Sequence, residues 1–125
     1  MGCGLPMAIG ASFARNKGEV LCLVGDGGMM LNLQELATIQ HHKLPIRIIV
    51  YCNDGYLMLK NTQTGSGMQL SGVDKATGIT LPDFRKIAVA FDMMTASIRT
   101  REDYREVIPK LMASDGLSIF WPRSN

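Results

Sequence analysis

The 125-residue sequence predicts an α/β fold, a three-layer, doubly wound parallel sheet with helices on both faces. Two observations carry this prediction. Val20–Val24 is a continuous apolar run of strand length, as expected for a strand buried on both faces, and Ile46–Cys52 is a second expected buried strand, rich in β-branched residues. Segments with helical periodicity precede, separate and follow these runs. Strands that alternate with helices form parallel sheets with right-handed crossovers.

The first half of the chain is expected to hold two helices besides the two strands. Residues 5–15 indicate a helix with small, closely packing residues. After the first strand, a second helix is expected to begin near Met30. Its amphipathic face follows the i, i+3, i+4, i+7 spacing: Leu33, Leu36, Ala37 and Gln40. Pro45 closes the connection to the second strand.

The second half begins with residues 61–80, whose glycines and small polar residues predict a long functional or mobile loop. Pro82 then opens a helix. Met93–Ile98 and Leu117–Trp121 are the expected third and fourth strands. A further helix lies between them, and Pro109 should strain or bend it.

Composition excludes several classes of protein. The sequence is 46% hydrophobic and 19% charged, which is typical of a single soluble globular domain. Its net charge is +2 and its basic residues alternate with acids, so no nucleic-acid partner is expected. No apolar run approaches the roughly 18 residues needed to cross a membrane, so no membrane association is expected. The widely spaced Cys3, Cys22 and Cys52 indicate reduced thiols and a cytoplasmic location.

Two polar loops directly follow the two apolar strands. Asp26 lies between glycines after the first strand, and Asn53 follows the second. Ligands of open α/β sheets bind beyond the carboxyl ends of the strands, so the two loops are expected to share a site. A carboxylate and an amide oxygen suit Mg²⁺, and a helix start can hold a phosphate. Taken singly, each loop is also compatible with a plain Asp-Gly turn.

The spacing of the loops resembles the diphosphate-binding signature of thiamine diphosphate enzymes. That signature is Gly-Asp-Gly, about twenty-five residues, and an asparagine. Here 25 residues, from Gly28 to Cys52, separate the Gly-Asp-Gly from Asn53. Further segments resemble acetolactate-synthase-like enzymes: residues 2–11, 31–38, 44–46, 53–56 and 82–88.

The resemblance implies thiamine diphosphate and Mg²⁺ as cofactors. It makes Asp26 and Asn53 side-chain ligands of the magnesium ion, with the main-chain carbonyl of Gly55 as a third ligand. Cys52 replaces the first asparagine of the pair that the family usually has, a position not needed as a metal ligand.

The resemblance also implies a set of residues that bind the organic cofactor: Met1, Gly25, Gly27, Gly28 and Tyr56. Gly27 and Gly28 would present amides to the diphosphate. The family commonly has serine where Gly28 stands, so one hydroxyl contact is expected to be missing. Met1 aligns with the apolar residue that wedges between the cofactor rings, although it also fits a plain initiator methionine.

The fold implied by the resemblance is the thiamine diphosphate-binding fold without its first strand and helix, so residues 1–125 form a single partial domain. The implied function is diphosphate binding in a 2-oxo acid decarboxylase or carboligase similar to acetolactate synthase. Implied partners are a 2-oxo acid substrate, a pyrimidine-binding domain or subunit with the activating glutamate, and further copies in a homo-oligomer. The isolated chain is expected to be inactive. The alternative is a noncatalytic, truncated binding or assembly module. Met58, Lys60 and Gln63 are expected to border the site but do not name a substrate.

Overall fold

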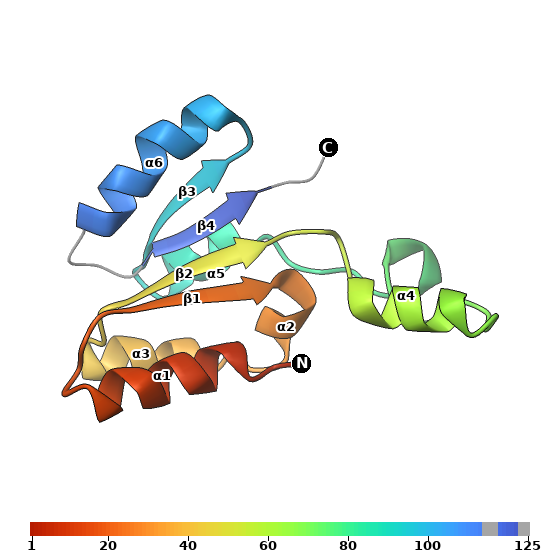
Figure 1. The fold of residues 1–125 in the computed structure, drawn as a ribbon, viewed down its shortest axis with the longest axis horizontal. Coiled ribbons are helices and arrows are strands. Elements are labelled where there is room, and N and C mark those ends of the chain that lie inside the picture. The colour runs from red at the N-terminus through yellow and green to blue at the C-terminus, as the bar shows by residue number, and fades with distance from the viewer. Residues whose placement is uncertain (114–117, 123–125) are drawn as a thin grey trace.

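The computed structural model of the chain describes residues 1–113 and 118–122. Within them, four parallel strands form one sheet in the order β1-β2-β4-β3. The strands are β1 (Val20–Gly25), β2 (Ile46–Tyr51), β3 (Met94–Ile98) and β4 (Ser118–Pro122). The parallel α/β fold predicted from the apolar runs is therefore confirmed (Figure 1).

Helices cover both faces of the sheet. On one face lie α1 (Gly4–Ala14), α3 (Glu35–His42) and α5 (Phe84–Ala90), and on the other lies α6 (Arg101–Ala113) (Figure 1). The larger core lies between helices α1, α3 and α5 and strands β1 and β2. Its fully buried side chains include Leu5, Leu36, Ile39, Ile46, Ile48 and Phe84. The three-layer arrangement follows because alternate side chains of each strand point to opposite faces.

The α6 face of the sheet is covered unevenly. Ile98 and Leu111 form a small core between β3 and α6, and Ile49 of β2 packs against it. On the same face of the sheet, but outside this core, Leu21, Leu23 and Tyr51 are 48%, 56% and 49% exposed. An apolar stripe thus remains open to solvent over β1 and the end of β2.

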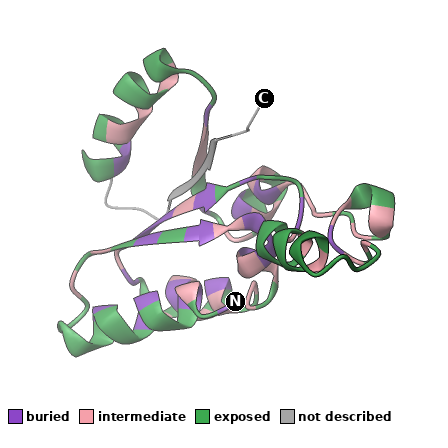
Figure 2. Cartoon of the chain, turned by 45° about the vertical axis from the view of Figure 1, so that its right-hand side comes forward, coloured by how far each residue is buried: buried purple, intermediate pink, exposed green. Residues whose placement is uncertain are grey.

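Two expected helix boundaries were wrong. The helix expected near Met30 begins four residues earlier, as the short helix α2 (Asp26–Met30), and the chain turns before α3 starts at Glu35. Residues 61–65, expected in a loop, belong to helix α4 (Leu57–Gly65), which projects from the body (Figure 1). This helix buries no side chain and is exposed along its length (Figure 2).

The rest of the expected loop contains a single turn of 3₁₀ helix, η1 (Lys75–Thr77). Helix α6 continues through Pro109 to Ala113. Leu117, the expected first residue of the last strand, lies outside the described residues. Among the described helices, none combines the length and apolar character that a membrane span requires.

Candidate functional site

The two predicted loops meet at the carboxyl edge of the sheet. β1 and β2 pair in parallel from Val20 opposite Ile46 to Gly25 opposite Tyr51, so both strands end at the same level. Asp26 is the next residue after β1, and Asn53 lies two residues beyond β2. The strand register therefore brings the two loops together, as the sequence predicted.

The carboxylate of Asp26 ties the loops to each other. Its Oδ1 atom accepts a hydrogen bond from the Gly27 N–H at 2.8 Å. Its Oδ2 atom accepts hydrogen bonds from the N–H groups of Asn53 and Asp54 at 2.9 and 2.8 Å. Burial raises the pKa of Asp26 above its usual 3.8, although these backbone hydrogen bonds favour the charged form. The side chain is only 2% exposed, so three amides hold it in one orientation.

Two polar groups, the Asn53 amide and the Gly55 carbonyl, converge beside this carboxylate. One terminal atom position of the Asn53 amide lies 2.9 Å from the Gly55 carbonyl oxygen and 3.1 Å from Asp26 Oδ1. With its nitrogen at that position, the amide donates hydrogen bonds to both oxygens. A 180° rotation of the amide places its oxygen there instead.

The spacing of these atoms fits a magnesium ion. Adjacent ligands of an octahedral Mg²⁺ bound at about 2.1 Å lie about 3 Å apart. The separations of the Asn53 position from the two oxygens, 2.9 and 3.1 Å, match this value. One carboxylate, one amide oxygen and one carbonyl are also the hard oxygen donors that Mg²⁺ prefers. The residues present therefore fit the metal.

At two glycines of the site a side chain would collide with a neighbouring group. A Cβ atom on Gly27 would overlap the ring of Tyr56, which lies directly against this position. A Cβ atom on Gly55 would overlap the carbonyl oxygen of Val73. Gly28 differs, because a Cβ atom there meets only Val24 Cγ2, at 3.4 Å. A serine side chain would therefore fit at this position with little displacement.

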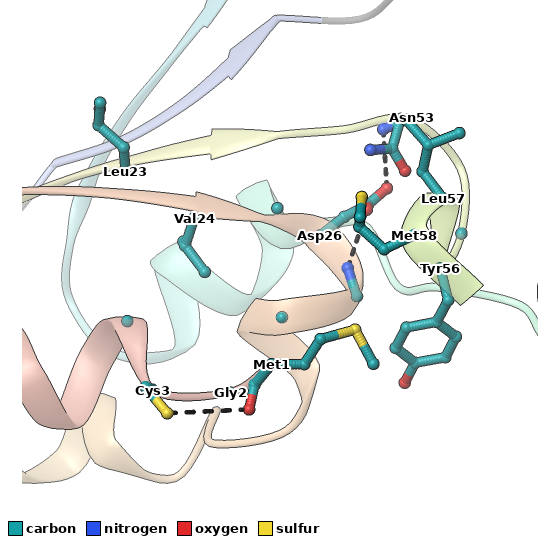
Figure 3. A pocket seen from close by; sticks show the side chains of 15 residues that line it. Met1, Gly2, Cys3, Leu23, Val24, Asp26, Asn53, Tyr56, Leu57 and Met58 are labelled. Atoms are coloured by element: carbon teal, nitrogen blue, oxygen red, sulfur yellow. Dashed lines mark hydrogen bonds between the residues drawn. The ribbon is translucent and has the colours of Figure 1, made fainter. Parts of the chain in front are cut away.

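The site opens into a cavity of about 400 Å³ (Figure 3). All eight residues predicted from the sequence line it: Met1, Gly25, Asp26, Gly27, Gly28, Asn53, Gly55 and Tyr56. Met1 is 67% exposed at the rim. Figure 3 shows the side chains of Met1, Asp26 and Tyr56 around the same space.

Sequence reasoning missed other residues at the site. Cys3 and Leu23 line the cavity, and so does Leu57. Met58 borders the cavity as expected, whereas Lys60 pairs with Asp74 and Gln63 bonds to the backbone of Ser71.

Sequence reasoning also did not identify the turn at residues 73–77, which contacts Gly55. It contains Asp74 and Thr77, which form a capping box at the start of η1. The polar pair spaced three residues apart is a recognisable capping pattern and could have predicted this turn, but not its position against the site.

Comparison with known proteins agrees with this geometry. Residues 1–120 match the family model described as "Thiamine pyrophosphate enzyme, C-terminal TPP binding domain". The chain is 34% identical over 119 residues to the acetolactate synthase isozyme 2 large subunit of Escherichia coli (strain K12), covering 93% of this chain and 21% of that protein. It is 36% identical over 109 residues to the acetolactate synthase large subunit of Pyropia yezoensis, covering 86% of this chain and 18% of that protein.

A solved structure has the same fold. The Rhodococcus jostii RHA1 thiamine diphosphate-dependent 4-hydroxybenzoylformate decarboxylase superposes with a TM-score of 0.83 and 25% identity, over 100% of this chain and 23% of that one. The chain spans about a fifth of the length of the curated relatives named above. Its sequence and fold together show that it belongs to the thiamine pyrophosphate enzyme family, as an acetolactate-synthase-like C-terminal TPP-binding domain.

Proposed function

We propose that this chain binds thiamine diphosphate in a magnesium-dependent manner, as the diphosphate-binding part of a 2-oxo acid decarboxylase or carboligase resembling acetolactate synthase. The observation that carries the proposal is the convergence of Asp26, Asn53 and Gly55, with separations of 2.9 and 3.1 Å that suit an octahedral cation. Family membership supports the organic cofactor.

In the proposed complex, the Asp26 carboxylate, the Asn53 amide oxygen and the Gly55 carbonyl hold the metal. The Asn53 amide turns its oxygen toward the ion, because its nitrogen cannot ligate a cation. The remaining ligands of Mg²⁺ are diphosphate oxygens and water. Bound thiamine diphosphate would supply the electron sink for cleavage next to a carbonyl group.

Glycines let the diphosphate approach the backbone. The Gly27 N–H donates to Asp26, so it orients the metal ligand. Gly28 lies in the first turn of α2, where N–H groups have no intrahelical partner, and its amide is proposed to face the diphosphate. Gly25 leaves open space, since no atom lies within 4 Å of where its Cβ would be. Tyr56 and Met1 border the organic part of the cofactor.

Further partners complete the proposed enzyme. Among the residues that the structure describes, no glutamate lines the cavity, and Glu19 instead accepts a hydrogen bond from Arg47 at 3.0 Å. We therefore infer that a pyrimidine-binding domain or subunit supplies the activating glutamate. The substrate is a 2-oxo acid, the active form is a homo-oligomer, and the isolated chain does not turn over substrate.

Calorimetric titration of thiamine diphosphate into the protein, with Mg²⁺ and then with a chelator, tests the proposal. Binding is expected only with Mg²⁺, and Asp26→Ala should weaken it at least about 100-fold because a charged ligand is lost. Glu106→Ala removes an exposed carboxylate of α6 that does not line the cavity, and it should leave the affinity for thiamine diphosphate unchanged. No heat and no thermal stabilisation at millimolar cofactor would contradict the proposal and favour the noncatalytic assembly module.

A further inference from the structure

We propose that the turn formed by Val73–Thr77 is a positioning device for the metal site, acting through the hydroxyl of Thr77 and the carboxylate of Asp74. Its role is to orient the Gly55 carbonyl toward the magnesium ion. This inference rests on the proposed function, because it assigns a purpose to residues that touch neither metal nor cofactor.

The turn contacts the peptide group whose carbonyl is the proposed ligand. The Tyr56 N–H donates a hydrogen bond to the Val73 carbonyl oxygen at 2.8 Å. That N–H and the Gly55 carbonyl belong to one trans, planar peptide group, so they point in opposite directions. Fixing the N–H toward Val73 therefore directs the Gly55 oxygen the other way, toward Asp26 and Asn53.

The contact is close and leaves little freedom. Gly55 and Asp74 form an isolated antiparallel bridge, and Val73 is buried. The Val73 carbonyl oxygen lies where a Cβ atom of residue 55 would be, so only glycine allows the approach. The turn thus explains why this position needs glycine.

The Thr77 side chain holds the Val73–Asp74 peptide group through the Asp74 N–H, which points away from the Val73 carbonyl, and it also binds the N–H of the preceding peptide group. Thr77 Oγ1 accepts hydrogen bonds from the N–H groups of Val73 at 3.0 Å and Asp74 at 2.9 Å. It donates to Asp74 Oδ1 at 2.9 Å, and the Thr77 N–H donates to that oxygen at 3.1 Å. The Val73 carbonyl is therefore held at a fixed angle by the hydroxyl of Thr77.

An ion pair connects the turn to the projecting helix. Lys60 Nζ of α4 lies 2.8 Å from Asp74 Oδ2, the oxygen of Asp74 that Thr77 does not use. Helix α4 follows directly after Gly55 and Tyr56 in the chain. The segment from Gly55 to Lys60 is consequently held by the turn at both ends.

The test compares Thr77→Val, which keeps the side-chain shape but loses the hydroxyl, with Thr77→Ser, which keeps the hydroxyl. Thr80→Val removes an exposed hydroxyl from the same segment and is the matched control. At saturating thiamine diphosphate, the Mg²⁺ concentration for half-maximal binding should rise about tenfold in Thr77→Val, as for other residues that orient a metal ligand. Thr77→Ser and Thr80→Val should stay within about twofold of the wild type.

Two further readouts separate positioning from general damage. At saturating Mg²⁺, Thr77→Val should regain the wild-type affinity for thiamine diphosphate, because the glycine contacts to the diphosphate do not involve the turn. In the cofactor-free protein, hydrogen exchange of the Tyr56 N–H should be faster in Thr77→Val than in the wild type. Asp74→Ala, which removes the other capping group, should also raise the Mg²⁺ requirement and speed up hydrogen exchange of the Tyr56 N–H.

An unchanged Mg²⁺ requirement in Thr77→Val and Asp74→Ala, with a wild type that binds and an Asp26→Ala variant that does not, would overturn the positioning role alone. Equal loss of affinity at every Mg²⁺ concentration would overturn it as well. A wild type that binds no cofactor would overturn the proposed function and this inference with it.

Discussion

At the scale of single residues, the site depends on the environment of one carboxylate. Asp26 is buried and accepts three backbone hydrogen bonds from its own loop and the neighbouring one. Burial disfavours its charged form, whereas a bound cation requires that form. The cofactor-free protein therefore carries an electrostatic cost at Asp26 that metal binding would relieve.

This cost gives a prediction for the titration of Asp26. Because burial raises its pKa, the Asp26 carboxyl of the cofactor-free protein should titrate with a midpoint above 3.8. By linkage, its contribution favours the fold below 3.8 and is lost as the pH rises through the raised pKa. The carboxyl ¹³C shift of Asp26 in a pH series measures the midpoint.

Adding Mg²⁺ and thiamine diphosphate supplies the control for this titration. The cation competes with the proton, so the midpoint of Asp26 should fall, as expected for an adjacent opposite charge. A midpoint at or below 3.8 in the cofactor-free protein, or one that the cofactors leave unchanged, would contradict the role given to Asp26.

At the scale of elements, the parallel strands β1 and β2 place the two loops of the site at one edge of the sheet. Helix α5 begins next to these loops. Asp83 is the N-cap of α5 and accepts a hydrogen bond from the Arg85 N–H at 3.0 Å. The Arg85 guanidinium also binds both carboxylate oxygens of Asp83, at 3.0 and 2.6 Å. These side-chain and backbone hydrogen bonds lower the pKa of Asp83 to about 2.

Asp83→Ala should lower the free energy of unfolding by about 1 kcal/mol at neutral pH, the usual effect of losing an N-cap. The lowered pKa means that Asp83 stabilises the fold above about pH 4, and that this stabilisation is lost as the pH falls toward 2. The difference between variant and wild type in urea denaturation should therefore shrink from pH 6 to pH 3. Glu106→Ala controls for the loss of one negative charge, and a difference that grows in acid would contradict the capping role.

At the scale of the whole molecule, the two faces of the sheet are unequal. Helix α6 covers β3 (Figure 1). Leu21, Leu23 and Tyr51 form an exposed apolar stripe on the same face of the sheet. Contiguous exposed apolar surface marks interaction sites, and β1 is an edge strand of the sheet that the described residues form. This stripe supports the proposed homo-oligomer.

Sedimentation velocity should accordingly give a species larger than a monomer at micromolar concentration. Leu21→Lys places a charge in the stripe and should raise the dissociation constant at least about tenfold, because a charge would be buried in an apolar contact. Val89→Lys introduces the same charge at an exposed apolar position of α5 and should have no effect. A monomeric wild type would refute the assembly.

Much of the site could be predicted because its signal is local. Asp26, Asn53 and Gly55 each follow an apolar run that could be recognised as a strand, and parallel strands end at one edge of a sheet. The extents of two helices, α2 and α4, were predicted wrongly, for identifiable reasons. The α4 segment carries no apolar stripe at helical spacing, which agrees with the absence of buried side chains in this helix. Helix α2 contains two glycines, which are poor helix formers.

By itself, the sequence determined the parallel α/β class and eight of the residues that line the cavity, since apolar periodicity and motif spacing are properties of neighbouring residues. Only the tertiary structure decided the strand order β1-β2-β4-β3 and the open stripe over β1. It also brought Val73 against Gly55 and the ring of Tyr56 against Gly27. Those contacts join residues distant in the chain, or arise from backbone angles that no local pattern specifies, so their geometry exists only once the chain is folded.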